Sequence, residues 1–354
     1  MPPRATGLIL QRGPEMQQWK SVVVRIACLS GALLLGSFAP AADYRLLNAA
    51  YDVARDVYRD MNPAFIAHWR ATHPSDALKI DMSHGGSSKQ ARAVMDGLAA
   101  DFVAMNSSLD IDAIAASGLL AKDWARQLPQ AASPSWSTIM FIVRKGNPRQ
   151  VRDWNDLIRP GVGVVVPNPK TSGNGRYSYL AAWEYARRLP GGSDATARAF
   201  VARLLYNVPV FDSGGRAATT TFVQRGIGDV LLTFENELRL ISAEFKDQQF
   251  QIIVPSLSVR ADNPVAVVTN VAEKRRTRAV AEEYARFHFT VAGQEIFARH
   301  GLRPADPAVL ARHASDFPAV NLFTVDQAFG GWAQAQRTHF SDGGIFDQIM
   351  EKRR

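Results

Sequence analysis

From residue 44 onward, short apolar segments alternate with longer amphipathic ones, and this alternation is the feature that most restricts the fold. The short segments are rich in β-branched residues and predict strands, whereas the longer ones have helical periodicity. Strands that alternate with helices form sheets covered by helices, so the sequence predicts an α/β protein. A chain of 354 residues suits two cores of ordinary size better than one, and we therefore expect two lobes.

The predicted elements divide between these lobes. The predicted strands are residues 44–49, 78–82, 102–105, 138–144, 162–166, 208–211, 230–234, 251–254 and 265–268. The predicted helices are residues 53–71, 89–98, 177–188, 195–205, 219–225 and 274–289. Irregular stretches at 128–137 and 255–264 predict the two crossings between the lobes. We therefore expect lobe I at 42–130 and 260–320, lobe II at 131–259, and a C-terminal packing segment at 321–354.

The first 41 residues have the pattern of an export signal. Basic residues at 16–25 precede an apolar stretch at 26–38 and an Ala-x-Ala site at 39–41, with Met16 as an alternative start of translation. A retained membrane anchor is the other interpretation, but the apolar stretch is short for a span. Cys28, the only cysteine, lies in this segment. The sequence thus predicts a periplasmic protein whose mature chain has no disulfide and no thiolate site.

Four strand-to-helix turns combine small residues, hydroxyl groups and a predicted helix start. A helix start leaves backbone N–H groups unpaired and carries the positive end of the helix dipole, so it attracts anions without a formal charge. Ser87 and Ser172 add hydroxyl donors, and glycines let a ligand approach the backbone. The turns are Tyr51-Asp52, residues 83–89 (SHGGSSK), residues 170–176 (KTSGNGR) and residues 212–216 (DSGGR).

Any one of these turns is most simply interpreted as a helix cap, because Ser, Asp and Gly are common before helices. Four of them after strands favour a shared role. Two turns belong to each expected lobe, so together they would supply donors from both sides to a tetrahedral anion, whose binding would favour closure of the lobes. The sequence therefore predicts an oxyanion site in a cleft between the lobes.

At these same residues the chain resembles the periplasmic sulfate-binding proteins of ABC importers, a family that includes thiosulfate binders. The resemblance covers nearly all of the expected mature chain. The matching segments are LLNAAYDVARDVY, MSHGGSSKQARAVMDGLAAD, DIDAIA, STIMFIVRKGNPR, DWNDLIRPGVGVVVPNPKTSGNGRYSYLAAWEYA, FDSGGRAATTTFVQRGIGDVLLTFENE, AEEYARFHFTVAGQEI and FGGWAQAQRTHFSDGGIFDQI. The resemblance implies the type II periplasmic-binding-protein fold, with two α/β lobes and the ligand in the cleft between them.

The resemblance also implies a shell of neutral donors around a dehydrated anion. The groups that it implies are the backbone N–H of Asp52, the hydroxyl of Ser87, Ser172, and the backbone N–H groups of Gly173, Asn174 and Gly215. Sulfate has no proton at neutral pH, so a pocket of donors suits it and rejects protonated phosphate. Arg176 and Arg216 then lie behind the turns and fix their backbone, although a direct ion pair with the ligand is the alternative.

The sequence departs from the family at the site itself. Phe234 replaces a tryptophan whose indole N–H contacts the anion, and phenylalanine has no donor. Asn106, Ser107 and Ser108 occupy a mostly apolar segment of the family, where they would supply replacement donors or acceptors for a protonated or larger ligand. Asn174 replaces a glycine but keeps its backbone N–H. Two interpretations remain: sulfate with a rearranged shell, or a site adapted to thiosulfate, phosphate or an organic sulfonate.

Enzymatic signatures do not accompany these turns. The segment HGGS at 84–87 has no G-x-S-x-G partner, the chain has no P-loop, and its seven histidines lack the spacing of a metal site. We therefore expect no catalytic residues, metal or cofactor. The net charge of +8 is spread along the chain without basic blocks, so nucleic acid is not an expected partner. We expect a monomer that delivers its anion to ABC permease subunits in the inner membrane, with an oxyanion sensor as the alternative.

Overall fold

The computed structural model describes residue 1 and residues 42–353. The described residues from Asp43 onward form one compact unit. The predicted export signal at 1–41, with Met16 and Cys28, lies outside the described residues apart from residue 1. No helix among the described residues is both long and apolar enough to cross a membrane.

Within residues 42–353 the strands form two sheets. The strands are β1 (Asp43–Tyr51), β2 (Ala77–Gly85), β3 (Phe102–Ala104), β4 (Ser135–Val143), β5 (Val164–Pro167), β6 (Phe211–Asp212), β7 (Val230–Phe234), β8 (Gln251–Ile253), β9 (Ser258–Asn263), β10 (Val265–Val267), β11 (Arg303–Pro304) and β12 (Leu322–Phe323). The first sheet has the order β10-β3-β1-β2, and the second has the order β12-β9-β4-β7-β5-β6, with β8 and β11 also paired to β4. We refer to the elements around these sheets as the first and second lobes.

The helices connect these strands and cover the sheets. The α-helices are α2 (Arg55–Thr72), α3 (Ser87–Met95), α4 (Ser108–Ala116), α5 (Pro129–Ala132), α6 (Gly173–Arg188), α7 (Asp194–Tyr206), α8 (Gly215–Val223), α9 (Glu235–Glu244), α10 (Thr269–Lys274), α11 (Arg278–Phe287), α12 (Val291–Arg299), α13 (Pro307–Arg312), α14 (Val325–Phe329), α15 (Trp332–Ala335) and α16 (Ile345–Glu351). Shorter helical turns are η2 (Asp52–Ala54), η3 (Trp124–Arg126), η4 (Trp154–Ile158), η5 (Lys246–Gln248), η6 (Ala314–Asp316) and η7 (Gln336–Phe340).

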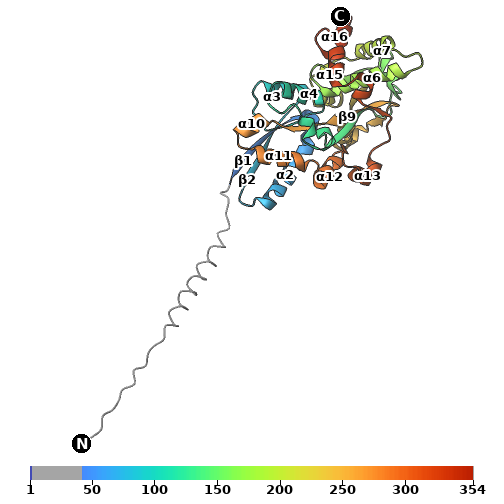
Figure 1. The fold of residues 1–354 in the computed structure, drawn as a ribbon. Coiled ribbons are helices and arrows are strands. Elements are labelled where there is room, and N and C mark those ends of the chain that lie inside the picture. The colour runs from blue at the N-terminus through green and yellow to red at the C-terminus, as the bar shows by residue number, and fades with distance from the viewer. Residues whose placement is uncertain (2–41, 354) are drawn as a thin grey trace. The chain divides into compact units, whose positions relative to one another are not determined.

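The first sheet lies between two layers of helices, with α3 and α4 on one face and α2 and α11 on the other (Figure 1). Alternate residues of β1 enter different cores, as the period of two in a strand requires. Leu46 and Ala50 are buried in the same cluster as Phe65 of α2, whereas Ala49 is buried with Ala91 of α3. This layering buries both faces of the sheet and leaves the strand ends as the surface on which a site can form.

The two sheets place their parallel strands in a similar way. β1 runs parallel to β2 and β3, and β5 runs parallel to β6 and β7. The carboxyl ends of parallel strands meet at one edge of a sheet, where ligands of open α/β sheets bind. In the first lobe η2, α3 and α4 begin at that edge, and in the second lobe α6, α8 and α9 do so. The four turns identified in the sequence are therefore strand ends of this kind.

The chain passes to the second lobe before β4 and returns between β9 and β10. The two passages lie side by side, because Ser135 at the start of β4 pairs with Asn263 at the end of β9. Asn263 Nδ2 also donates to Ser135 Oγ at 3.2 Å. β11 at 303–304 and β12 at 322–323 join the second sheet. The exact lobe boundaries given above stay a prediction.

The local predictions succeed best where a strand is fully buried. The strand predicted at 230–234 is β7 with the same bounds, and the helix predicted at 274–289 is α11, which begins four residues later, at Arg278. The strand predicted at 208–211 is reduced to Phe211–Asp212. Helices α4, α9 and α12 were not predicted. Each starts just after a segment that had been assigned to a strand, a turn or another helix.

Candidate functional site

The helix starts at the edges of the two sheets have no side-chain caps. η2 begins at Asp52, α3 at Ser87, α6 at Gly173 and α8 at Gly215, and none of the residues before them makes a capping hydrogen bond. Ser172 precedes α6 and is of a capping type, but its side chain does not cap. The helices α7, α13 and α14, by contrast, are capped by side chains. Most N–H groups at the sheet edges are thus left for another acceptor. The exceptions are those of Val53 and Arg216, which donate to the carboxylate of Asp52.

These helix starts converge from both lobes. A Cβ atom on Gly86 would lie 2.7 Å from the carbonyl oxygen of Thr171 and 2.9 Å from that of Ser213. A Cβ atom on Gly214 would lie 2.5 Å from Oδ2 of Asp52. Only glycine fits where the backbones approach this closely. The turns predicted from the sequence therefore touch each other across the lobes, a convergence that the sequence could not show.

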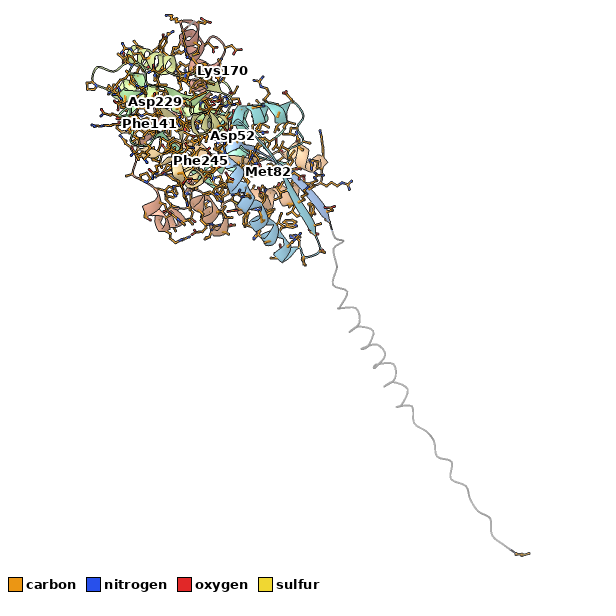
Figure 2. All side chains as sticks on the ribbon, turned by 180° about the vertical axis from the view of Figure 1, so that it is seen from behind. Asp52, Met82, Phe141, Lys170, Asp229 and Phe245 are labelled. Carbon is orange, nitrogen blue, oxygen red and sulfur yellow. The ribbon has the colours of Figure 1, made fainter. Side chains whose placement is uncertain are left out.

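Asp52 ties the second lobe to the first. It lies where the lobes meet, between Met82 of the first sheet and Phe141 of the second (Figure 2). The backbone N–H of Arg216, in the first turn of α8, donates to Asp52 Oδ2 at 3.0 Å. Burial raises the pKa of Asp52, although the hydrogen bond from Arg216 opposes that rise. A carboxylate from the first lobe therefore takes up one free N–H group at the start of α8 and leaves its neighbours available.

The Arg216 guanidinium group is surrounded by carboxylates. Nη2 of Arg216 lies 2.6 Å from Oδ2 of Asp56, and Nη1 lies 3.3 Å from Oε1 of Glu237. Burial raises the pKa of Glu237 to about 7, and Arg216 and the hydroxyl of Thr219 limit that rise. The positive charge behind α8 is thus paired within the protein. This arrangement agrees with a supporting role for Arg216 rather than a direct ion pair with a ligand.

Arg176 is paired in the same way at the start of α6. Its Nε donates to the carbonyl oxygen of Pro169 at 3.1 Å, and its Nη1 donates to Oδ1 of Asp110 at 3.2 Å. Both charged side chains are almost fully buried. The hydroxyl of Ser87 donates to the other carboxylate oxygen, Oδ2, at 2.5 Å. Arg176 therefore fixes the turn before α6 and joins it to α3 and α4 through Asp110.

Asn106 lies directly on the start of α6. A Cβ atom on Gly173 would lie 1.9 Å from Oδ1 of Asn106, 2.7 Å from its Cγ and 3.1 Å from its Nδ2. Asn106 is buried, with 2% of its surface exposed. Oδ1 has no hydrogen-bond partner among the described residues, and the same is true of the hydroxyl oxygens of Ser107 and Ser88. Buried polar atoms are rarely left unpaired, so this cluster is suited to a ligand.

Asn174 and Phe234 lie in the second lobe, beside the same contact between the lobes. Asn174 Nδ2 donates to the hydroxyl of Thr233 at 2.9 Å, and Asn174 Oδ1 accepts from the hydroxyl of Ser178 at 3.3 Å. Phe234 is buried and packs edge-on against Tyr177, with 5.9 Å between the ring centroids. One N–H group and the carbonyl oxygen of the Asn174 amide are thus occupied within the second lobe.

Comparisons with known proteins agree on one family. The model of the bacterial extracellular solute-binding protein family matches residues 46–303. A thiosulfate-binding protein of Pseudomonas aeruginosa is 53% identical over 91% of this chain and 96% of its own, and the sulfate-binding protein of Escherichia coli is 48% identical over 90% and 97%. The solved structure of the sulfate-binding protein SubI from Mycobacterium tuberculosis has a TM-score of 0.74 at 33% identity, over 83% of this chain and 98% of that one.

The chain belongs to the family of sulfate- and thiosulfate-binding proteins. Its fold is the two-lobe type II fold of periplasmic binding proteins. Within this member of the family, the structure brings the predicted site residues together at the lobe contact. Ser87, Ser172, Gly173, Asn174 and Gly215 are buried there. Asp52 is half-buried beside them.

The predicted modifiers divide into two groups. Asn106 and Ser107 are buried at the lobe contact, whereas Ser108 is half-buried as the first residue of α4. Two residues of this family member were missed by the sequence reasoning: Asp110, which joins Ser87 to Arg176, and Thr233, which holds Asn174. Asp110 lies in the segment DIDAIA that carried part of the resemblance, so a signal was present. Nothing in the sequence marks Thr233 as the partner of Asn174.

Proposed function

We propose that this protein captures sulfate or thiosulfate in the periplasm and delivers it to the permease subunits of an ABC importer. The observation that carries the proposal is the contact of uncapped helix starts from both lobes around Asp52, Gly86, Gly173 and Gly215. Backbone N–H groups at such starts bind an oxyanion that has no proton to donate. The relatives named as sulfate- and thiosulfate-binding proteins support this ligand class.

Charge pairing explains how the site would hold a dianion without a free cation. Arg176 is paired with Asp110, and Arg216 is paired with Asp56 and Glu237. The attraction for the ligand then comes from oriented N–H dipoles, which are fixed before the ligand arrives. Because donors belong to both lobes, an anion between them would stabilise the conformation in which the lobes touch.

The proposal describes a receptor and not an enzyme. The relatives are solute-binding proteins, which supports a role in binding. We propose that the protein acts as a monomer without a cofactor and reaches the periplasm through the signal at residues 1–41. Transfer to the permease would follow when the lobes separate.

Calorimetric titration tests the proposal. The exported protein is stripped of ligand by unfolding and refolding, and is then titrated at neutral pH with sulfate, thiosulfate, phosphate and methanesulfonate. We expect tight binding of sulfate or thiosulfate, with one anion per chain and a higher Tm. Absence of heat and of a Tm shift with both sulfur oxyanions, together with a response to phosphate or methanesulfonate, would show that the ligand lies outside the proposed class.

A further inference from the structure

The side chain of Asn106 has the position of a ligand-binding group. It follows β3, faces Gly173 at the first turn of α6, and is 2% exposed. Its backbone N–H donates to Ser87 Oγ at 3.3 Å, which fixes the main chain beside α3. Among the described residues, Oδ1 of its side-chain amide is buried without a hydrogen-bond partner. A buried amide atom without a hydrogen-bond partner costs free energy, and a ligand that bonds to the amide would remove that cost.

The other side chains at the site offer few free hydrogen-bond donors. Ser87 has a single hydroxyl hydrogen, and in this structure it is directed to Asp110 at 2.5 Å. Phe234 has no donor where the resembling family has an indole N–H. One N–H of Asn174 Nδ2 is occupied by Thr233. Asn106 therefore brings a further side-chain amide to the start of α6.

The amide of Asn106 has two possible roles towards a ligand: it can donate from Nδ2 or accept at Oδ1. Oδ1 is the atom nearest to Gly173, and Nδ2 is farther from it. The start of α6 carries the positive end of the helix dipole, which attracts the carbonyl oxygen and repels the amide hydrogens. Without an anion Oδ1 therefore faces the helix. Because Nδ2 also lies only 3.1 Å from the position of a Cβ atom on Gly173, rotation of the terminal amide brings its N–H groups to an anion held there.

We propose that Asn106 is an anion-binding residue that donates from Nδ2 to an oxygen of the bound sulfur oxyanion, in place of the indole donor that Phe234 lacks. This assignment rests on the function proposed above and adds a specificity-determining residue to it. A donor at this position selects fully deprotonated oxyanions. A protonated phosphate would need an acceptor here instead.

Two substitutions test the role of Asn106. Asn106→Ala removes the donor, and we expect about tenfold to hundredfold weaker binding of sulfate or thiosulfate, whichever the unaltered protein binds more tightly. Asn106→Asp keeps the shape but brings a negative charge to the anion, and we expect more than about a hundredfold loss. Both dissociation constants are measured by calorimetry at pH 8 on full-length exported protein, and the Tm without ligand shows whether each variant folds.

Asn321→Asp is the matched control, because it makes the same change at an exposed asparagine beside β12 and should leave affinity unchanged. Unaltered affinity in folded Asn106→Ala would overturn the donor role, and so would an Asn106→Asp variant that binds as tightly as the control. If the unaltered protein bound neither sulfate nor thiosulfate, the proposed function would fail first and this assignment with it. Loss of affinity confined to the Asn106 variants would support both the proposed function and the donor role of Asn106.

Discussion

Replacing Gly86 by alanine is expected to abolish tight anion binding while leaving each lobe folded. Gly86 precedes α3 with φ −53° and ψ 138°, a conformation that alanine adopts without strain. Its Cβ atom would nevertheless lie 2.7 Å from the carbonyl oxygen of Thr171 and 2.9 Å from that of Ser213, both in the second lobe. The clash is therefore with backbone of the other lobe, and it arises only when the lobes touch.

The size of the effect follows from these distances. The shorter contact falls about 0.7 Å below the 3.4 Å at which ordinary contact begins, so the lobes must separate by a similar amount at this point. A hydrogen bond of normal length stretched this far is no longer a hydrogen bond. Losing two bonds to a charged ligand at about 1.5 to 3 kcal/mol each weakens binding by at least about 3 kcal/mol, or more than a hundredfold.

The assay compares calorimetric dissociation constants for sulfate and thiosulfate and the Tm with and without ligand. We expect Gly86→Ala to keep the Tm of the ligand-free protein and to lose the ligand-induced rise. Gly85→Ala is the matched control, because its Cβ atom would meet only the flexible end of Gln90, at 3.0 Å. Affinity of Gly86→Ala within threefold of the control would refute the reasoning that the contact of Gly86 with Thr171 and Ser213 belongs to the ligand-bound state.

Three further predictions concern the aromatic wall and two buried titrating groups. Phe234→Trp supplies an indole N–H and should strengthen sulfate binding by about tenfold or more in calorimetry, whereas Phe234→Leu, which also lacks a donor, should not. Glu237 keeps a proton in the folded state up to a pKa of about 7 instead of 4.5, so stability should fall as the pH rises from 4.5 to about 7, and Glu237→Gln should flatten that part of the profile in urea unfolding. The buried His288 has a pKa lowered by burial from 6.5 to about 4, so stability should be lost as the pH falls from 6.5 to about 4. His288→Gln should reduce this acid sensitivity; an unchanged pH profile in either variant would assign the effect to other groups.

The sheet-edge turns could be predicted because their signals are local. Glycine, serine and aspartate at a strand-to-helix junction have the same meaning wherever the helix goes, so the starts at Asp52, Ser87, Gly173 and Gly215 were placed correctly to within a few residues. The start of the helix predicted at 274–289 was placed four residues too early, because the turn at 275–277 was missed. Its residues keep a helical pattern, and only the positive φ of Arg276 marks the break.

The partners across the lobes could not be predicted in the same way. The hydrogen bond from Arg216 to Asp52 joins residues 164 positions apart, and the contact of Asn106 with Gly173 joins the ends of two different sheets. Such pairs depend on how the lobes meet, which no local pattern encodes. The same limit explains why Asp110 and Thr233 were not recognised as supports of Ser87 and Asn174.

Because the arginines at the lobe contact are paired with carboxylates, the net charge of the chain contributes little to the attraction of an anion within the site. The chain has a formal charge of +8, yet Arg176 and Arg216, which lie in the first turns of α6 and α8, are paired with Asp110, Asp56 and Glu237. A paired arginine orients the backbone that it contacts but offers little net charge to a ligand. The basic surface can therefore raise the rate at which anions arrive, an effect that salt screens. Selection among those anions is left to fixed N–H groups and to Asn106, because hydrogen bonds of fixed geometry distinguish an acceptor from a donor and net charge does not.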